Sequence, residues 1–266
     1  MKYIINKGMA GLGNRLQSLG LAADKALEHN AELAVDWTDP SWLLGFDAYF
    51  RIDSRKLNLV NPDELPDDLV VKPEEWRDFW KIPAGGEKNG IKGIKAQSKT
   101  VDPDCGGHVI CCYKYPHSDF IYRTLRPSKE VLEWRTAVLR DMKVPSLYDA
   151  YHIRHTDKKT DGWKQKVRRA RRRQERDGIP VLILTDSVMV RAGAAGLGLT
   201  VPSWILEPDR LGGVHHKKVD RDTKHLINLS AIADLWTAVK ARKFVASCPD
   251  STFSIFAERK RALSSK

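Results

Sequence analysis

KYIINKGMAGLGNRLQSLGLAADKALEHNAELAVD, residues 2–36, contains the pattern from which the fold class of this chain follows. Lys2–Asn6 is a short apolar run of the kind that forms a buried strand. A glycine-rich turn follows at Gly8–Gly13, and apolar residues then recur at helical spacing over Asn14–Asn30. Glu32–Asp36 has the composition of a second strand. A strand, a glycine turn, a helix and a strand in this order are typical of a parallel α/β sheet.

The same alternation restarts after Val144-Pro145-Ser146, which we interpret as a domain junction. The sequence predicts helices at Ser128–Arg140, Gly162–Arg176, Ser187–Ala195, Leu226–Ala241 and from Ser251 onward. It predicts strands near His108–Tyr113 and at Ala150–Arg154, Pro180–Thr185, Trp204–Glu207 and Lys243–Ser247. We therefore expect an α/β protein of two facing Rossmann-like domains, a GT-B-like architecture, with domains at 1–145 and 146–266. Residues 37–124 form an irregular middle region, in which Gly85–Ala96 reads as an exposed loop.

The bulk composition is that of an ordinary globular protein. Of 266 residues, 42% are hydrophobic and 30% are charged. No apolar run is long enough to cross a bilayer, and the N-terminus lacks the apolar core of a signal peptide, so we expect a cytoplasmic location. The 4 cysteines contain no C-x-x-C pair. That spacing favours reduced thiols over a zinc site or a disulfide framework.

The formal net charge of +11 is concentrated in one segment. Residues 164–176 contain eight Lys or Arg and a single acid, Glu175. A solvated helix face is the simplest explanation of such a run. The alternatives are an arginine-rich surface for RNA or DNA and a surface for an anionic glycan or a membrane that carries the acceptor. No RNA-reading aromatic motif accompanies the run, so we expect no nucleic-acid partner.

The first candidate site is the glycine turn before the first helix. Glycines let a backbone approach a phosphate, and a helix N-terminus offers free N–H groups. Asp36 at the end of the second strand also suits a dinucleotide-binding dehydrogenase, but Leu16 replaces the third glycine of that motif. A tight turn without a ligand stays open as a third reading. The candidate ligand-binding residues are Gly11, Gly13, Asn14 and Arg15.

The second candidate site is HIRHTDK, His152–Lys158, where a strand ends and a helix follows. Open α/β sheets bind ligands at such strand ends. In an extended segment, Arg154 lies on the same side as His152 and Thr156. A guanidinium there can clamp a diphosphate with two parallel hydrogen bonds. An ion pair between Arg154 and Asp157 at the surface is the alternative.

The third candidate site lies further along the chain. The loop that contains His215 can reach a base or a sugar, and Asp234 on an apolar helix can accept the N1–H and amine of a guanine. SCPDST, Ser247–Thr252, is a turn from a strand into a helix. Its residues Asp250, Ser251 and Thr252 either cap the helix or leave its amides to a phosphate.

Taken together and in order, these three segments resemble the fucosyltransferase family that includes the nodulation fucosyltransferase and the core N-glycan α-1,6-fucosyltransferases. That family has a G-x-G-N-R-like loop after the first strand and an H-[VI]-R-[RH]-T-D-K-like motif at the nucleotide domain. A downstream D…L…S…[ST]-F segment closes its donor site. The matching sequences here are GLGNRLQSLGLA (Gly11–Ala22), HIRHTDK and ADLWTAVKARKFVASCPDSTFSIFA (Ala233–Ala257).

The resemblance implies roles for individual residues of this chain. His152 would touch the guanine, Arg154 would hold the β-phosphate, and Asp157 and Lys158 would organise that loop. Asp234 would recognise guanine, Ser251 would donate to a phosphate, and Asn14 would approach the sugar diphosphate. This sequence departs from the family pattern at His155, which stands in place of a second arginine, and at Asp161, which lies one position early for the expected acid. The interval between Asp234 and Ser251 is one residue longer than in the family pattern.

The resemblance predicts an enzyme that transfers fucose from GDP-fucose to a glycan hydroxyl with inversion and without a metal or cofactor. The expected catalytic residues are Arg154, Asp157, Lys158 and Asp161. The expected substrate-binding residues are Gly11, Gly13, Asn14, Arg15, His152, His155, His215, Asp234, Asp250, Ser251 and Thr252. Asp157, Asp161 or His155 would relay the acceptor proton. Another nucleotide sugar and an arginine-rich nucleic-acid-binding protein are the alternatives.

Overall fold

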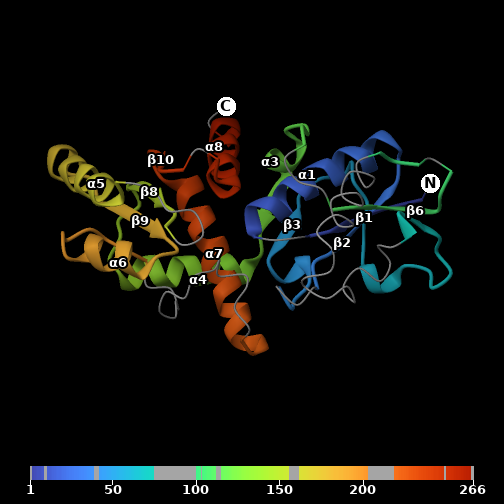
Figure 1. Cartoon of the computed structure of the whole chain (residues 1–266), viewed down its shortest axis with the longest axis horizontal. Helices are drawn as coiled ribbons and strands as arrows, with labels where there is room; N and C mark the ends of the chain where they lie inside the picture. The colour runs from blue at the N-terminus through green and yellow to red at the C-terminus, as the bar shows by residue number, and fades with distance from the viewer. Residues whose placement is uncertain are drawn as a thin grey trace. The chain divides into compact units, whose positions relative to one another are not determined.

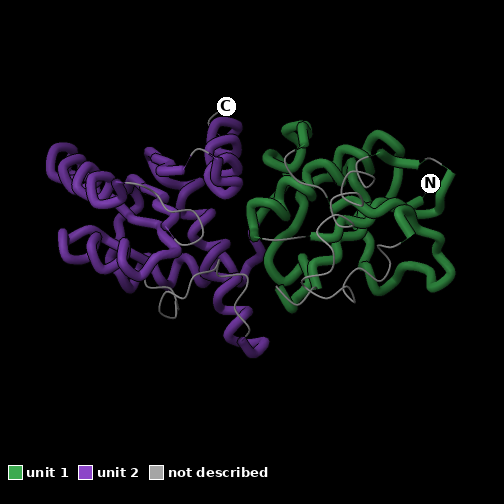
Figure 2. Tube along the Cα trace, viewed as in Figure 1, with its two compact units in different colours: residues 1–126 green, residues 127–266 purple. Residues whose placement is uncertain are grey.

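The computed structural model divides into two compact units, residues 1–126 and 127–266 (Figures 1 and 2). It describes residues 2–8, 11–38, 42–74, 100–102, 104–111, 115–155, 162–202, 219–248 and 250–264. Each unit contains a parallel sheet with helices packed on it. The predicted fold class, α/β with two Rossmann-like parts of the GT-B type, is confirmed.

The first unit contains a five-stranded parallel sheet in the order β4-β2-β1-β6-β5. Its strands are β1 (Tyr3–Lys7), β2 (Glu32–Asp36), β4 (Leu59–Val60), β5 (Val71–Lys72) and β6 (Gly107–Ile110). The helix α1 (Leu12–Glu28) connects β1 to β2 and packs on the sheet. The opposite face buries Ile5, Ala34 and Val109 against Leu65 and Leu69. The predicted strand–turn–helix–strand opening is therefore confirmed.

The other described helices and strands of this unit are short. They are η1 (Phe46–Ala48), β3 (Phe50–Ile52), η2 (Pro62–Glu64), α3 (Phe120–Thr124) and β7 (Leu125–Pro127), and β3 pairs with β7. Trp37 packs edge-on against Trp42, Phe46 and Phe50. The predicted exposed loop at Gly85–Ala96 lies outside the described residues. The irregular middle region thus contributes two edge strands, β4 and β5, to the main sheet.

A buried polar network fixes β1 to its neighbours. The side chain of Asn6 donates to Ser18 Oγ at 2.9 Å and to the carbonyl of Ile110 at 3.1 Å. Asn6 also accepts a hydrogen bond from Trp37 Nε1 at 3.0 Å. One amide therefore joins α1, β6 and the aromatic cluster, and each of these buried polar groups is satisfied.

The second unit contains a three-stranded parallel sheet in the order β10-β8-β9. Its strands are β8 (Asp149–Ile153), β9 (Val181–Thr185) and β10 (Phe244–Ala246). Its helices are α4 (Lys129–Asp141), α5 (Trp163–Asp177), α6 (Val188–Ala195), α7 (Arg221–Lys240) and α8 (Thr252–Ser264). Helices α5 and α6 share a buried cluster with β8 and β9 (Figure 1).

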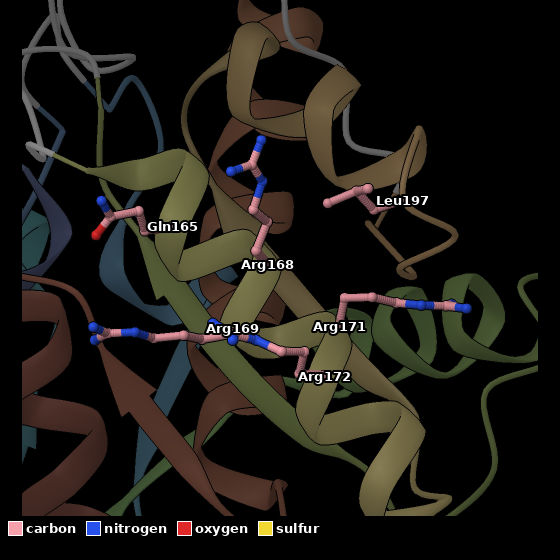
Figure 3. Close-up of a pocket in the computed structure, with 6 residues that line it drawn as sticks. All are labelled: Gln165, Arg168, Arg169, Arg171, Arg172 and Leu197. Carbon is pink, nitrogen blue, oxygen red and sulfur yellow. The ribbon is translucent and has the colours of Figure 1, made fainter.

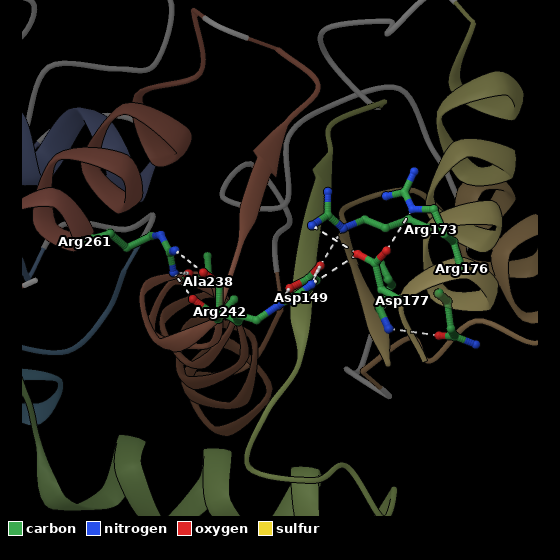
Figure 4. A network of polar contacts seen from close by, with 10 residues as sticks. Asp149, Arg173, Arg176, Asp177, Ala238, Arg242 and Arg261 are labelled. Atoms are coloured by element: carbon green, nitrogen blue, oxygen red, sulfur yellow. Dashed lines mark hydrogen bonds and ion pairs between the residues drawn. The ribbon is translucent and has the colours of Figure 1, made fainter. Parts of the chain in front are cut away.

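An ion-pair network holds the amino end of β8 (Figure 4). Asp149 is fully buried, and Arg242 binds both its oxygens, at 2.8 and 2.9 Å. Arg173 of α5 donates to the same carboxylate at 2.6 Å, and Asp177 pairs with Arg173 and Arg242. Burial acts to raise the pKa of Asp149, but the hydrogen bonds from Arg242 and Arg173 outweigh it and hold that pKa below its ordinary value. Arg173, one of the basic residues of segment 164–176, therefore stabilises the fold by binding Asp149.

The predicted helices and strands of this half agree with the structure, with differences at their ends. Helix α7 begins at Arg221 instead of Leu226, because the side chain of Asp220 accepts the N–H of Thr223 at 2.8 Å and caps the helix. The predicted strand at Trp204–Glu207 lies outside the described residues. Helix α4 packs on α7 and so belongs to the second compact unit, whereas the predicted boundary at 145/146 assigns it to the first domain.

Among the described residues, no helix is both long enough and apolar enough to span a bilayer. No disulfide joins Cys105, Cys111 and Cys248 to one another.

Candidate functional site

The carboxyl ends of three parallel strands bring polar residues together in the second unit. Residue 152 on β8 is in register with residue 246 on β10, and residue 153 with residue 185 on β9. The N–H of Ser247 donates to the carbonyl of His152 at 2.9 Å. Residues that follow these strands, such as Arg154 and Asp186, therefore lie at one edge of the sheet, where open α/β sheets bind ligands.

His152 is a buried, neutral imidazole at this edge. Its Nδ1 lies 2.8 Å from Ser254 Oγ, and its ring lies 4.5 Å from that of Phe253. Burial and, to a lesser extent, the charge of Arg154 lower the pKa of His152 to about 3. When Ser254 donates to Nδ1, the imidazole proton resides on Nε2. The ring then offers one N–H donor, as expected of a residue that contacts a base.

Arg154 and His155 share one carboxylate, that of Asp186. The Nε of Arg154 lies 3.9 Å from Asp186 Oδ2, and the backbone N–H of His155 donates to Oδ1 at 2.9 Å. The side chains of Arg154 and Asp186 are 21% and 22% exposed. The ring of His155 lies 6.0 Å from that of Trp163. Asp186 therefore orients the backbone that carries the predicted diphosphate clamp.

Asp186 is absent from the residues selected by the sequence patterns. A usable signal existed, because Asp186 directly follows the predicted strand Pro180–Thr185. Neighbouring parallel strands end at the same edge of a sheet, so an acid at the end of one strand lies beside a base at the end of the next.

The start of α8 completes the described part of this edge. Ser251 is fully buried, and its Oγ makes no hydrogen bond within the described residues. Its backbone N–H donates to the carbonyl of Cys248 at 3.1 Å. The side chain of Ser251 therefore does not act as the cap suggested by the composition of the turn. Thr252 is buried and Asp250 is exposed.

Two cations lie on the helices near this edge. Lys166 of α5 donates to the carbonyl of Ser247 at 2.8 Å. Burial lowers the pKa of Arg191 on α6, and the charge of Asp234 on α7 partly opposes this. The predicted guanine-binding acid, Asp234, is therefore half-buried near a guanidinium that the sequence patterns did not single out.

The glycine turn of the first unit leads directly into α1. Gly11 is the N-terminal cap of α1, in an extended conformation, and no side chain caps this helix end. Gly13 is buried in the first turn, and Asn14 is half-buried. Arg15 was expected to face a ligand, but it is fully buried, with its guanidinium 5.0 Å from the ring centre of Trp42. The aromatic cluster holds the Arg15 cation in this structure.

Both carboxylate oxygens of Asp36 bind other groups of the protein. Its Oδ2 pairs with Lys7 at 3.2 Å, and its Oδ1 accepts from the backbone and the hydroxyl of Thr38. This arrangement removes the feature that favoured a dinucleotide-binding dehydrogenase.

Several predicted residues lie outside the described part of the chain. These are Asp157, Lys158, Asp161 and His215. Two D-x-D sequences, at residues 102–104 and 220–222, match a pattern found at some metal sites. The first acid of each has a structural partner: Asp102 pairs with Lys72 at 2.7 Å, and Asp220 caps α7. The described residues contain no group of three or more His, Cys, Asp or Glu that could hold a metal ion.

The comparisons with known proteins agree on the fold. No protein-family model matches this sequence, and no curated protein sequence matches it. Solved fucosyltransferases share this fold. A NodZ α-1,6-fucosyltransferase soaked with GDP-fucose matches with a TM-score of 0.70 at 18% identity, over 97% of this chain and 92% of that one.

Two further solved structures share this fold. POFUT1 in complex with GDP-fucose matches with a TM-score of 0.58 at 14% identity, over 98% of this chain and 94% of that one. An Arabidopsis thaliana FUT1 variant in complex with GDP matches with a TM-score of 0.57 at 12% identity, over 98% of this chain and 68% of that one. This protein therefore has the fold of these fucosyltransferases along nearly its whole length.

Proposed function

We propose that this protein transfers fucose from GDP-fucose to a hydroxyl group of a glycan. The observation that carries the proposal is the placement of Arg154, oriented beside Asp186 at the carboxyl edge of a parallel sheet, in a fold shared with proteins solved with GDP-fucose. In this proposal residues 146–266 bind the nucleotide sugar and residues 1–145 form the acceptor side.

The donor would be held by charge and by hydrogen-bond donors. Arg154 would bind the β-phosphate, and the hydroxyl of Ser251 with the amides at the start of α8 would bind a second phosphate group. The neutral His152 and the carboxylate of Asp234 would contact the guanine. A buried hydroxyl without a partner in the described part of the chain is costly, and a phosphate oxygen would satisfy it.

The reaction would be a single displacement with inversion. The acceptor oxygen forms a bond to the anomeric carbon of fucose, while the bond from that carbon to the β-phosphate oxygen breaks and its electron pair leaves with GDP. Arg154 and Lys158 would neutralise the growing charge on GDP, so that no divalent ion is required. Asp157, Asp161 or His155 would take the acceptor proton.

The finer assignments belong to the same proposal. A cytoplasmic location and a peripheral contact with an anionic or membrane-linked acceptor are expected. Gly11, Gly13 and Asn14 would approach the sugar diphosphate from the uncapped start of α1, and His215 would reach the base or the sugar. Another GDP-sugar, such as GDP-mannose, would use the same phosphate contacts.

A ligand panel tests the nucleotide preference. Thermal unfolding is measured with GDP, UDP, ADP, NAD and their sugar conjugates, with and without EDTA. GDP and GDP-fucose should raise the unfolding temperature most, and EDTA should not reduce the shift. Fucose transfer to a panel of glycans then tests the activity. Equal stabilisation by UDP or NAD, or a shift that EDTA removes, would contradict the proposal.

A further inference from the structure

The outer face of α5 forms a basic surface on a shallow hollow. Arg168, Arg169, Arg171 and Arg172 line a hollow of about 440 Å³ together with Gln165 and Leu197. We call these six residues the arginine surface. Figure 3 shows the side chains of Arg169 and Arg171 extending to opposite sides of the helix. The four arginines lie within five residues, about 6 Å of helix rise.

Most of these charges have no counter-ion in the described part of the chain. Arg168, Arg169 and Arg172 are exposed and make no ion pair there, whereas Arg171 pairs with Glu175 at 2.7 Å. The opposite face of α5 is different, because Arg173 reaches the buried carboxylate of Asp149. The helix therefore separates a structural arginine from an outward-facing group with unbalanced positive charge.

Exposed apolar side chains accompany the arginine surface. Leu197 is 39% exposed, and Met189 on α6, the helix packed beside α5, is 56% exposed. At the start of α5, Lys164 lies 5.8 Å from the ring centre of the half-buried Trp163. Trp163 packs against the buried cluster of this unit, so the arginines and the exposed aliphatic side chains carry the comparison. Such a combination is typical of surfaces that lie at a membrane interface.

We propose that the arginine surface binds the phosphate headgroups of an anionic phospholipid bilayer, with Leu197 at the boundary of the headgroups and the acyl chains. A leaflet offers each guanidinium its own phosphate, whereas a single small anion can satisfy only one or two of them. None of the residues that line the hollow is aromatic, so it offers no platform on which nucleic-acid bases could stack. An exposed leucine among arginines likewise suits lipid better than RNA.

This surface would bring the enzyme to a membrane that carries its acceptor, and in that respect the inference rests on the proposed function. Binding to lipid itself does not require a donor or an acceptor. The two proposals can therefore fail separately.

Vesicle flotation of the full chain, without nucleotide, tests the inference. Vesicles of phosphatidylcholine alone are compared with vesicles that also contain phosphatidylglycerol. The test variant is Arg168→Gln, Arg169→Gln and Arg172→Gln combined, since glutamine preserves the helix. The control variant is Lys129→Gln, Lys143→Gln and Lys240→Gln combined, which removes the same charge from exposed positions on and beside α4 and α7.

The native protein should bind only the vesicles with phosphatidylglycerol. The arginine variant should bind them at least ~10-fold more weakly, and the control should bind nearly as the native protein does. Leu197→Ser should weaken binding at high salt, where contact with the acyl boundary contributes most. Unfolding temperatures and their shift by GDP should be unchanged in all variants, which separates this result from the donor site.

Three outcomes would overturn the inference. The first is no binding of the native protein to anionic vesicles. The second is an equal loss in the arginine and lysine variants, which would indicate net charge alone. The third is stronger binding to duplex RNA, or to inositol hexakisphosphate, than to vesicles at the same phosphate concentration and salt. A missing GDP shift would instead count against the fucosyltransferase proposal and leave the vesicle result standing.

Discussion

Asp186 lies between the side chain of Arg154 and the backbone of His155, with its Oδ2 3.9 Å from Arg154 Nε and its Oδ1 2.9 Å from the His155 N–H. The strong hydrogen bond therefore goes to the backbone, and the guanidinium is oriented by charge at a longer distance. This geometry positions Arg154 at the strand end. A carboxylate that positions a phosphate-binding arginine in this way is expected to affect catalysis without contacting the substrate.

The first prediction concerns this positioning. Asp186→Asn retains an acceptor for the His155 N–H but loses the charge, so kcat/KM for donor should fall by ~10-fold. Asp186→Ala removes both the acceptor and the charge, so kcat/KM for the donor should fall further, by ~100-fold. Steady-state kinetics with GDP-fucose measures both values. Native-like kinetics in the alanine variant would show that Arg154 does not depend on Asp186.

The second prediction concerns Ser251. Its buried Oγ has no hydrogen-bond partner within the described residues, so Ser251→Ala removes an unsatisfied polar group and should not lower the free energy of unfolding. If a phosphate oxygen satisfies this hydroxyl, the same change should weaken GDP binding by ~10-fold, as measured by calorimetry. Ser254→Ala is the matched control, since it removes the partner of His152 and should destabilise the protein by ~1 kcal/mol. Native GDP affinity in Ser251→Ala would exclude the phosphate contact.

The third prediction is a pH dependence of stability from His152. Its pKa is about 3 in the folded protein, against an ordinary value of 6.5. Above pH 6.5, His152 is neutral in both the folded and the unfolded protein, so it does not change the free energy of unfolding. As the pH falls below it, the unfolded chain gains a proton that the folded protein does not accept, so stability falls by about 1.4 kcal/mol per pH unit until the folded pKa is reached.

Urea denaturation at pH 7 and pH 5 measures this effect, and the native protein should lose about 2 kcal/mol more than a His152→Asn variant does. The comparison with the variant removes the contribution of the other titrating groups. Equal losses in the two proteins would mean that His152 is protonated in the folded state.

The fourth prediction concerns the ion-pair network of Asp149. Asp149→Ala leaves Arg173 and Arg242 without their buried partner and should destabilise the protein by about 3–5 kcal/mol. Arg176→Ala is the control, because its side chain is 71% exposed and a surface pair contributes about 0–1 kcal/mol. Chemical denaturation measures both. A small loss in Asp149→Ala would show that the network adds little to stability.

Much of the fold could be predicted because the patterns of apolar residues that indicate helices and strands are local properties of the sequence. Strand β2 and the helix that follows Ser187 begin and end close to where the apolar patterns place them. Arg15 shows the limit of such patterns. A cation at a helix start suggests ligand binding, yet its burial depends on Trp37 and Trp42, which come from a distant part of the chain.

The sequence patterns selected residues for the candidate site but not the contacts that support them, and the roles of the selected residues stay predictions. Arg154 and His152 were selected because they share one short motif. Asp186 and Arg191 were missed because they approach the motif or Asp234 only through tertiary packing. The same holds for Asp149, whose partners Arg173 and Arg242 lie on two separate segments.

The most direct test of the account is the turnover number of Arg154→Ala with GDP-fucose and a glycan acceptor, with Arg140→Ala as an exposed control. The account predicts a fall of ~100-fold to 1000-fold in kcat for Arg154→Ala, an unchanged unfolding temperature, and native activity in the control. Near-native turnover in a folded Arg154→Ala protein would contradict the proposal that this guanidinium stabilises the departing GDP.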